Sequence, residues 1–181
     1  MSNFHKLNLN GYYNCKLVYD DLPKSGEFGF DNICILKSDF KFNENEIIDG
    51  VEFRFYNGSF DNVVCNGQEI SINKSAAKLH FINFAYWGDT NEFIKVVYAD
   101  GDEETVKIPF IDWSYEYKHD RQLENFYGGV NTVKIMLSSG ALIHPVYFYH
   151  TACNLNKNAV VEKIILPDNM FTHIFALSIE E

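Results

Sequence analysis

Short apolar segments alternate with turn-forming residues along the chain, and the clearest unit begins at residues 79–85. These residues are almost wholly apolar, which is typical of a strand buried on both faces of a sheet. Residues 93–99 predict a second strand, and Asp100-Gly101 predicts a tight turn because both residues tolerate positive φ. Apolar and polar positions alternate in residues 105–110, which predicts a returning strand. Pro109 cannot donate a hydrogen bond to a neighbouring strand, so this strand ends there or lies at a sheet edge.

Similar short segments occur before and after this unit. Further strands are predicted at residues 33–36, 51–55, 62–65, 69–72, 130–137, 146–150, 160–166 and 174–179, with one or two more within residues 1–30. Residues 37–45 and 154–158 are polar and predict loops, while residues 118–129 predict a loop with one helical turn. About ten short strands without a convincing helix predict an all-β sandwich or barrel in a single domain, residues 1–181. The residues predicted to lie buried between its sheets are Phe53, Phe81, Val96, Ile108, Ile164 and Phe175.

The formal net charge of −10 indicates a surface that repels phosphate backbones and anionic membranes. No cluster of Lys and Arg offsets this charge, so nucleic-acid and membrane partners are not expected. No run reaches the roughly 18 apolar residues of a membrane span, and the first residues lack the apolar region of a signal peptide. These features predict a cytoplasmic protein whose four cysteines, Cys15, Cys34, Cys65 and Cys153, stay reduced.

Several short patterns also occur in an order that is similar to a known module. They are LNLNGYYN at 7–14, Gly26-Glu27-Phe28, DGVEF at 49–53, DNVVCNGQEISI at 61–72, the apolar strand followed by Gly88, YADG at 98–101, Asp112-Trp113 and VVEKIILPDNMFTHIFALSI at 160–179. Together they resemble the jelly-roll β-sandwich module that is appended to many bacterial glycosidases, a relative of carbohydrate-binding modules. The resemblance covers most of the chain. It implies an antiparallel two-sheet β-sandwich with jelly-roll topology and a carbohydrate ligand, and it brings no catalytic residue with it.

Trp87 precedes the polar residues 88–91 (GDTN) at the end of a predicted buried strand. Sugar sites combine an aromatic ring with Asp and Asn side chains because a pyranose has an apolar face and peripheral hydroxyls. The alternative is a tryptophan that covers the end of the sandwich. In residues 112–117 the aromatic side chains alternate with polar ones, which suits either an open ligand surface or one inner sheet face. The predicted ligand-binding residues are Trp87, Asp89, Asn91, Trp113, Tyr115, His119 and Arg121.

A group of acidic residues near the N-terminus consists of Asp20, Asp21, Glu27 and Asp31. Oxygen ligands from loops suit calcium, and sandwiches of the resembling class often hold a structural calcium, so these residues predict a calcium site. Solvated turn residues are the alternative. The six histidines show no HxH or HExxH spacing, so a sequence-local metal motif is not indicated. A three-histidine site assembled across strands is a further alternative.

The sequence indicates a fold more clearly than a reaction, and three hypotheses of different classes follow. The first is a non-catalytic carbohydrate-binding or carbohydrate-associated protein. The second is a small sugar-acting enzyme with a carboxylate and histidine site around Glu116, His119 and His144. The third is a structural β-sandwich that forms a homodimer through a sheet face. A binding domain requires exposed aromatic rings, whereas an enzyme requires a pocket in which ionisable groups lie close together.

Overall fold

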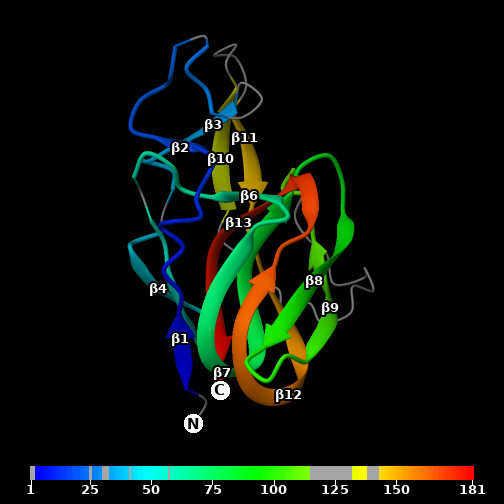
Figure 1. Ribbon diagram of the computed structural model, residues 1–181. Coiled ribbons are helices and arrows are strands. Elements are labelled where there is room, and N and C mark those ends of the chain that lie inside the picture. The colour runs from blue at the N-terminus through cyan, green and yellow to red at the C-terminus, as the bar shows by residue number, and fades with distance from the viewer. Residues whose placement is uncertain are drawn as a thin grey trace, which may run out of the picture.

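The computed structural model describes residues 3–24, 26–29, 33–40, 42–56, 58–114, 132–137 and 143–181, with the backbone alone at 132–137 and 143–145. These residues form thirteen β-strands and no helix (Figure 1). The strands are Phe4–Lys6 (β1), Val18–Tyr19 (β2), Ile33–Leu36 (β3), Asn45–Ile48 (β4), Val51–Arg54 (β5), Val63–Asn66 (β6), Glu69–Ala85 (β7), Thr90–Tyr98 (β8), Glu103–Phe110 (β9), Thr132–Leu137 (β10), Ile143–Tyr147 (β11), Tyr149–Ile165 (β12) and Asp168–Glu180 (β13).

The strands form one large sheet and two small ones. The large sheet has seven strands in the order β1-β13-β7-β12-β8-β9, and β6 pairs with β13 beside this path. A four-stranded sheet has the order β11-β10-β3-β2, and β4 and β5 form a separate hairpin. Among the described strands only β2 and β3 pair in parallel. The two termini lie at the same end of the molecule, where β1 pairs with the end of β13, and β10 and β11 lie at the opposite end (Figure 1).

The large sheet encloses its own hydrophobic core. The inner cluster consists of buried side chains from six of its seven strands together with three residues near the N-terminus: Leu7, Leu9, Tyr13, Val63, Cys65, Ile70, Ile72, Ala76, Leu79, Phe81, Ala85, Ile94, Val96, Tyr98, Val106, Ile108, Phe110, Cys153, Val161, Ile164, Leu166, Ile174, Leu177 and Ile179. Because one face of a single sheet supplies nearly all of this cluster, the sheet must curl around it. Burying this apolar surface is the main source of stability for such a fold.

A second hydrophobic core lies against the opposite face of the large sheet. This outer cluster joins β7, β12 and β13 to β2, β3, β5 and β11 through Leu17, Val18, Ile33, Ile35, Phe40, Val51, Phe53, Phe55, Ile82, Phe84, Ile111, Trp113, Val146, Phe148, Tyr149, Phe175 and Ala176. In β7, Leu79 and Phe81 point to the inner cluster, whereas Ile82 and Phe84 belong to the outer one. The prediction of a strand buried on both faces at residues 79–85 is therefore confirmed.

The predicted fold class is confirmed: the protein is all-β, with antiparallel sheets packed as a sandwich. All six residues predicted for the core are fully buried. The turn at Asp100-Gly101 connects β8 to β9, and Gly101 has the positive φ of 89° that favours glycine. Pro109 lies in β9, which is an edge strand of the large sheet, as its missing N–H requires.

One loop prediction was wrong. Residues 154–158 lie inside the 17-residue strand β12, where Asn154 pairs with Lys78 of β7 and the pairing resumes at Ala159, opposite Ala76. A register shift between Asn154 and Ala159 accommodates the extra residues there. The loop predicted at residues 37–45 is confirmed for its described residues up to Glu44, and β4, which was not predicted, begins at Asn45 and turns into β5 through Asp49 and Gly50. Residues 118–129 lie outside the described part of the chain.

None of the four cysteines forms a disulfide, and all four are described and buried. Burial raises the pKa of the Cys15, Cys65 and Cys153 thiols to about 12, so these side chains are neutral apolar groups at physiological pH. No helix in the described residues is long and apolar enough to cross a membrane.

Candidate functional site

The loop that follows β7 presents an exposed tryptophan in an unusual backbone conformation. This Trp87 loop comprises residues 86–89. The side chain of Trp87 is 76% exposed, and its φ is +79°. A bulky residue with positive φ is a genuine outlier, because the left-handed conformation costs an L-residue roughly 1–2 kcal/mol. Such strain persists only where the surrounding structure determines it, so the contacts around the loop require an explanation.

The carboxylate of Asp112 fixes the Trp87 loop from the end of β9. One Asp112 oxygen accepts the backbone N–H of Gly88, and the other accepts the backbone N–H of Ser114 at 2.8 Å. In the opposite direction, the Asp112 backbone N–H donates to the Asp89 carboxylate at 2.9 Å. The chain beyond Asp112 also pairs with the last residue of β7, since the Trp113 N–H donates to the Ala85 carbonyl at 3.1 Å. These reciprocal contacts hold Trp87 in place from both sides.

An aromatic side chain contacts the Trp87 ring, and further exposed apolar residues follow at the start of β13. Tyr86 meets it edge to face, with the ring centroids 5.7 Å apart. The Tyr86 backbone N–H donates to the carbonyl of Phe171 at 2.7 Å, which places the start of β13 beside the loop. Phe171 and its neighbour Met170 are 43% and 59% exposed. Exposed apolar residues therefore occur at the end of β7 and at the start of β13, two segments that a backbone hydrogen bond joins.

A polar group borders these residues at the start of β8. Glu92 Oε1 accepts the Thr90 hydroxyl at 2.7 Å and the Asn169 side-chain amide at 2.6 Å. Glu92 Oε2 makes no hydrogen bond to the described residues, so a second acceptor is available at this position. Asn91 lies between Thr90 and Glu92, is exposed, and pairs with Pro109 in β9. Sequence reasoning identified Trp87, Asp89 and Asn91 here but missed Glu92 and Asn169.

The other predicted ligand residues do not join this site. Trp113 is only 3% exposed and stacks on Phe84 in the outer cluster, with centroids 4.6 Å apart. Its inclusion as a ligand residue is corrected, because a ring enclosed by the core cannot meet a ligand; of the two interpretations of this stripe, Trp113 itself agrees with the core one. Tyr115, His119 and Arg121 lie outside the described residues. The structure also does not test the enzyme hypothesis, because Glu116 and the side chain of His144 lie outside the described residues.

The structure describes three of the four acidic residues predicted to bind calcium. Asp20, Asp21 and Glu27 are exposed, and Asp31 lies outside the described residues. Asp20 forms an ion pair of 3.0 Å with Lys37, while the Glu27 carboxylate accepts the backbone N–H of Lys24 at 3.1 Å. In the described residues, no group of three or more His, Cys, Asp or Glu side chains is arranged to hold a metal ion. The contacts of Asp20 and Glu27 are those of ordinary solvated turns.

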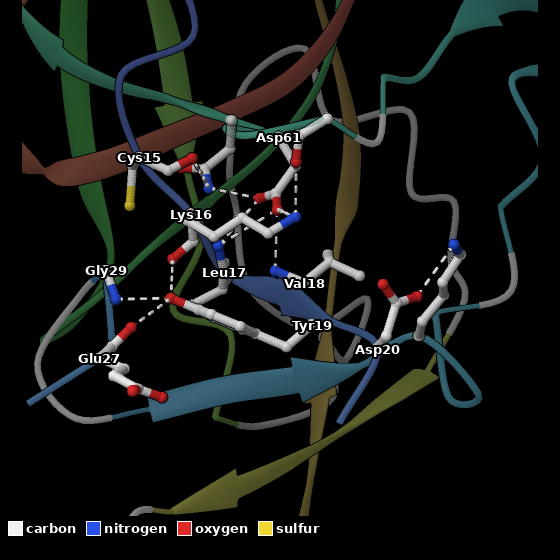
Figure 2. A network of polar contacts seen from close by, with 12 residues as sticks. Cys15, Lys16, Leu17, Val18, Tyr19, Asp20, Glu27, Gly29 and Asp61 are labelled. Carbon is white, nitrogen blue, oxygen red and sulfur yellow. Dashed lines mark hydrogen bonds and ion pairs between the residues drawn. The ribbon is translucent and has the colours of Figure 1, made fainter. Parts of the chain in front are cut away.

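A buried carboxylate that sequence reasoning missed lies nearby (Figure 2). Asp61 is 1% exposed and accepts the backbone N–H groups of Leu17 at 3.0 Å and Val18 at 2.9 Å. It also accepts the Asn62 side-chain amide at 2.9 Å and forms an ion pair of 3.0 Å with Lys16. Burial raises the pKa of Asp61, and the contacts from Asn62, Lys16 and Val18 oppose this effect. All of these donors belong to the protein, so the arrangement connects the N-terminal segment to the sandwich.

Two buried histidines form a second polar network between the large sheet and the β4–β5 turn. His80 Nδ1 lies 3.0 Å from His150 Nε2. The other ring nitrogens meet carboxylates: His80 Nε2 lies 3.1 Å from Glu180, and His150 Nδ1 lies 2.9 Å from Asp49. Lys78 also contacts the Glu180 carboxylate, at 3.3 Å. Sequence spacing could not reveal this group, because its members are as much as 131 positions apart in the chain.

The proton count of this network limits its chemistry. The network has three contacts: one between the two imidazole rings and one from each ring to a carboxylate. Each neutral imidazole carries only one N–H, so two neutral rings supply two protons for these three contacts. Burial lowers the pKa of His80 to about 4 and also lowers the pKa of His150, so a third proton is not bound at neutral pH. Every ring nitrogen already has a protein partner, so neither histidine presents a nitrogen to a substrate. The arrangement therefore differs from a nucleophile-activating dyad, in which one nitrogen must face the reacting group.

Comparison with known proteins places the fold in a family. No curated protein matches the chain closely enough to count as a relative. Residues 42–181 match the AziU2-like beta-sandwich domain, so the match begins just before β4 and includes the Trp87 loop, Asp112 and the histidine network. The match covers most of the sequence. The chain therefore belongs to the AziU2-like β-sandwich domain family.

Proposed function

We propose that this domain is a non-catalytic binding module that recognises a carbohydrate at the Trp87 loop. The observation that carries the proposal is the strained and exposed Trp87, held in position by the Asp112 carboxylate. An indole ring that is 76% exposed contributes little to the core of the protein. Maintaining it in a conformation that costs roughly 1–2 kcal/mol is explained if the ring has a ligand to meet.

The chemistry of the surrounding surface fits a sugar. A pyranose ring has an apolar face that stacks on an aromatic ring, and its hydroxyls both donate and accept hydrogen bonds. Trp87 and Phe171 supply the apolar contact, while Asp89, Asn91 and Glu92 supply polar groups at its border. Carboxylates recognise neutral hydroxyls without requiring a charged ligand.

The polar groups described near Trp87 are engaged in ways that support binding over hydrolysis. In the described part of the chain, His80 and His150 have all four of their ring nitrogens in contact with protein groups. Hydrolysis of a glycosidic bond generally needs two carboxyl groups that flank the bond. Near Trp87, the Asp112 carboxylate is already occupied by Gly88 and Ser114. Asp89 accepts the Asp112 backbone N–H, which gives it a structural role.

The test is a glycan array followed by titration of the best glycan against the wild-type protein, Trp87→Ala and Phe93→Ala. Phe93 is the matched control, because it is an exposed aromatic residue on the outer face of β8. We expect Trp87→Ala to weaken binding at least about tenfold. Stacking of a nucleic-acid base on an aromatic side chain contributes on the order of 1–3 kcal/mol, and we take a sugar ring of similar size to contribute a similar amount. Phe93→Ala should bind as the wild type does. Failure of the wild type to bind any glycan, or equal binding by Trp87→Ala, would overturn the proposal.

The same exposed surface would also suit a homodimer, and the test separates the two possibilities. A dimer interface formed by Trp87, Phe171 and Met170 would make the sedimentation coefficient depend on protein concentration. In that case Trp87→Ala would shift the protein to the monomer, and neither the wild type nor the variant would bind a glycan. We expect the wild type to sediment as a monomer at micromolar concentration, with the Trp87 ring available to the ligand.

A further inference from the structure

A pocket of about 390 Å³ lies beside the β4–β5 hairpin and shares no residue with the Trp87 loop. Its lining combines four aromatic and four polar side chains, namely Lys37, Phe40, Phe42, Asn43, Glu44, Arg54, Phe55 and Tyr56. Sites for small molecules are typically concave and mostly apolar, with a few polar groups that orient the ligand. The volume falls near the lower end of the range of roughly 300–1,000 Å³ for such sites, which indicates a ring-sized ligand.

The aromatic wall of this pocket is continuous with the outer cluster. Phe42 stacks on Phe55 with the ring centroids 4.4 Å apart and an angle of 4° between the planes. Behind it, Phe42 also stacks on Phe148, at 5.9 Å and 12°. Tyr56 is supported separately by stacking on Tyr13 at 5.7 Å. Because core residues fix these rings, the wall is formed before a ligand arrives, which lowers the entropic cost of binding a planar molecule.

Two cationic side chains, Arg54 and Lys37, line the pocket, and each makes an ion pair with an exposed carboxylate. Within the described residues, the Arg54 guanidinium makes one hydrogen bond, from Nη2 to Glu44 at 2.8 Å. Lys37 forms its 3.0 Å ion pair with Asp20, whose side chain is 79% exposed and does not line the pocket. Exposed ion pairs of this kind contribute only about 0–1 kcal/mol, so exchanging them for a ligand requires little energy.

Neutral donors and nearby acids complete the surroundings. The Tyr56 hydroxyl makes no hydrogen bond to the described residues and is partly exposed. The Asn43 side-chain amide donates to Glu46 at 2.6 Å, so this carboxylate is already satisfied at the border of the pocket. Glu44 is the single carboxylate in the lining, against the two cations. The lining is thus more positive than the rest of a protein whose net charge is −10.

We propose that this pocket binds a small aromatic molecule that carries a carboxylate group. The ring would lie against Phe42 and Phe55, and the carboxylate would meet Arg54, with Lys37 as a second contact. A guanidinium has five N–H donors in a planar fork, so Arg54 can engage a ligand carboxylate while it keeps the contact to Glu44. Charge-assisted hydrogen bonds of this kind are about twice as strong as neutral ones. The acidic surface elsewhere disfavours nonspecific binding of anions.

The experiment compares phenylacetate with phenylacetamide by isothermal titration and ligand-observed NMR. The two probes have nearly the same shape and differ in charge. We expect the wild type to bind phenylacetate at least about fivefold more tightly than the amide, with the preference decreasing at high salt. Arg54→Gln should abolish the preference, and Arg54→Lys should keep part of it because the charge remains without the fork. Circular dichroism would confirm that each variant is folded.

Two control variants locate the binding. Lys107→Gln removes an exposed cation from β9, opposite Phe93, and should leave phenylacetate affinity unchanged. Trp87→Ala should also leave it unchanged, because the Trp87 loop has no residue in the pocket. Equal affinity for the amide, absence of phenylacetate binding, or loss of binding in Trp87→Ala would each overturn this assignment. None of these outcomes bears on whether glycans bind at Trp87, so the two proposals can fail separately.

Discussion

Two aspartates, Asp61 and Asp112, have similar surroundings and different consequences. Both are nearly buried, and both accept backbone N–H groups from segments that are distant in the sequence. Asp61 receives two amides, a side-chain amide and the Lys16 ammonium, so every contact lies within the protein. Asp112 receives the amides of Gly88 and Ser114, and next to them an indole ring is exposed to solvent.

The difference lies in what each carboxylate orders. Asp61 fixes Leu17 and Val18, whose side chains are buried in the outer cluster, so the order it creates contributes to packing. Asp112 fixes a loop whose most prominent side chain contributes little to packing and adopts a strained conformation. A buried carboxylate is therefore informative about function only together with the exposure and backbone conformation of the residues that it positions.

The largest effect is expected from breaking the Asp61 contacts. Asp61→Ala leaves the Lys16 ammonium and two backbone N–H groups without their acceptor in a nearly dry environment. Removing one partner of a buried ion pair costs about 3–5 kcal/mol, and we expect a loss of this size in urea denaturation. Asp20→Ala is the control, because Asp20 is exposed and its loss should change stability by less than about 0.5 kcal/mol. Similar losses in both variants would contradict a special role for Asp61.

The histidine network contains two further carboxylates, Glu180 and Asp49, whose partners are the histidines His80 and His150. The pKa of His80 is lowered by burial from 6.5 to about 4, against the opposing influence of Glu180. Between these values the unfolded chain binds more protons than the folded chain, so stability is lost as the pH falls from about 6.5 towards 4. His80 alone should account for about 3 kcal/mol of this loss at pH 4. His150 acts in the same direction because burial lowers its pKa as well.

The measurement is the free energy of unfolding at several pH values between 4 and 7.5, for the wild type, His80→Gln and His5→Gln. The slope with pH is the readout, since the absolute stability of His80→Gln also reflects lost packing. Asp49, Glu180 and Lys78 are the charged groups that contact this histidine pair, and they are unchanged in both variants. His80→Gln should have a shallower slope, whereas His5→Gln in β1 should keep that of the wild type. An unchanged slope in His80→Gln would refute this assignment.

Removing the Asp112 carboxylate should have a smaller effect on stability and a large one on binding. Asp112→Ala leaves the Gly88 and Ser114 N–H groups without an acceptor in a partly solvated position, which costs about 1–2 kcal/mol. Glycan binding should weaken about as much as in Trp87→Ala, because the ring is no longer held in place. Asp102→Ala, in the exposed β8–β9 turn, should retain both properties. Binding by Asp112→Ala at wild-type affinity would show that an ordered loop is unnecessary.

Much of the fold could be predicted from local patterns. Alternating apolar residues located β8 and β9, and glycine chemistry located the turn between them. The lengths of β7 and β12 could not be predicted, because polar stretches such as residues 154–158 read as loops in isolation. The strand continues across this stretch because pairing with β7, which is distant in the sequence, holds it on both sides, at Asn154 and again from Ala159, and no local signal records such pairing.

The candidate site was predictable only in part, for a related reason. An aromatic residue before a polar loop indicated Trp87, and its exposure agrees with that interpretation. The contact from Asp112 joins residues on opposite sides of a hairpin, and Asn169 reaches Glu92 from a strand 77 positions away. The alternation of side chains shows which residues share a face, but not whether other parts of the protein cover that face. For this reason the sequence was consistent with Trp113 either in a ligand site or in the core.

The smallest effect tests the strain at Trp87 directly. Trp87→Ala and Trp87→Gly both remove the ring, so both should lose glycan binding to the same extent. They differ in the conformation at φ +79°, which alanine tolerates poorly and glycine adopts readily. We therefore expect Trp87→Gly to be more stable than Trp87→Ala by about 1 kcal/mol, measured by thermal or urea denaturation. At Phe93, within β8, the order should reverse, because glycine in a strand is less stable than alanine by about 0.5–1 kcal/mol. If alanine is the more stable replacement at both positions, the backbone at Trp87 is not strained. The loop that Asp112 fixes would then not differ in backbone strain from the segment that Asp61 fixes.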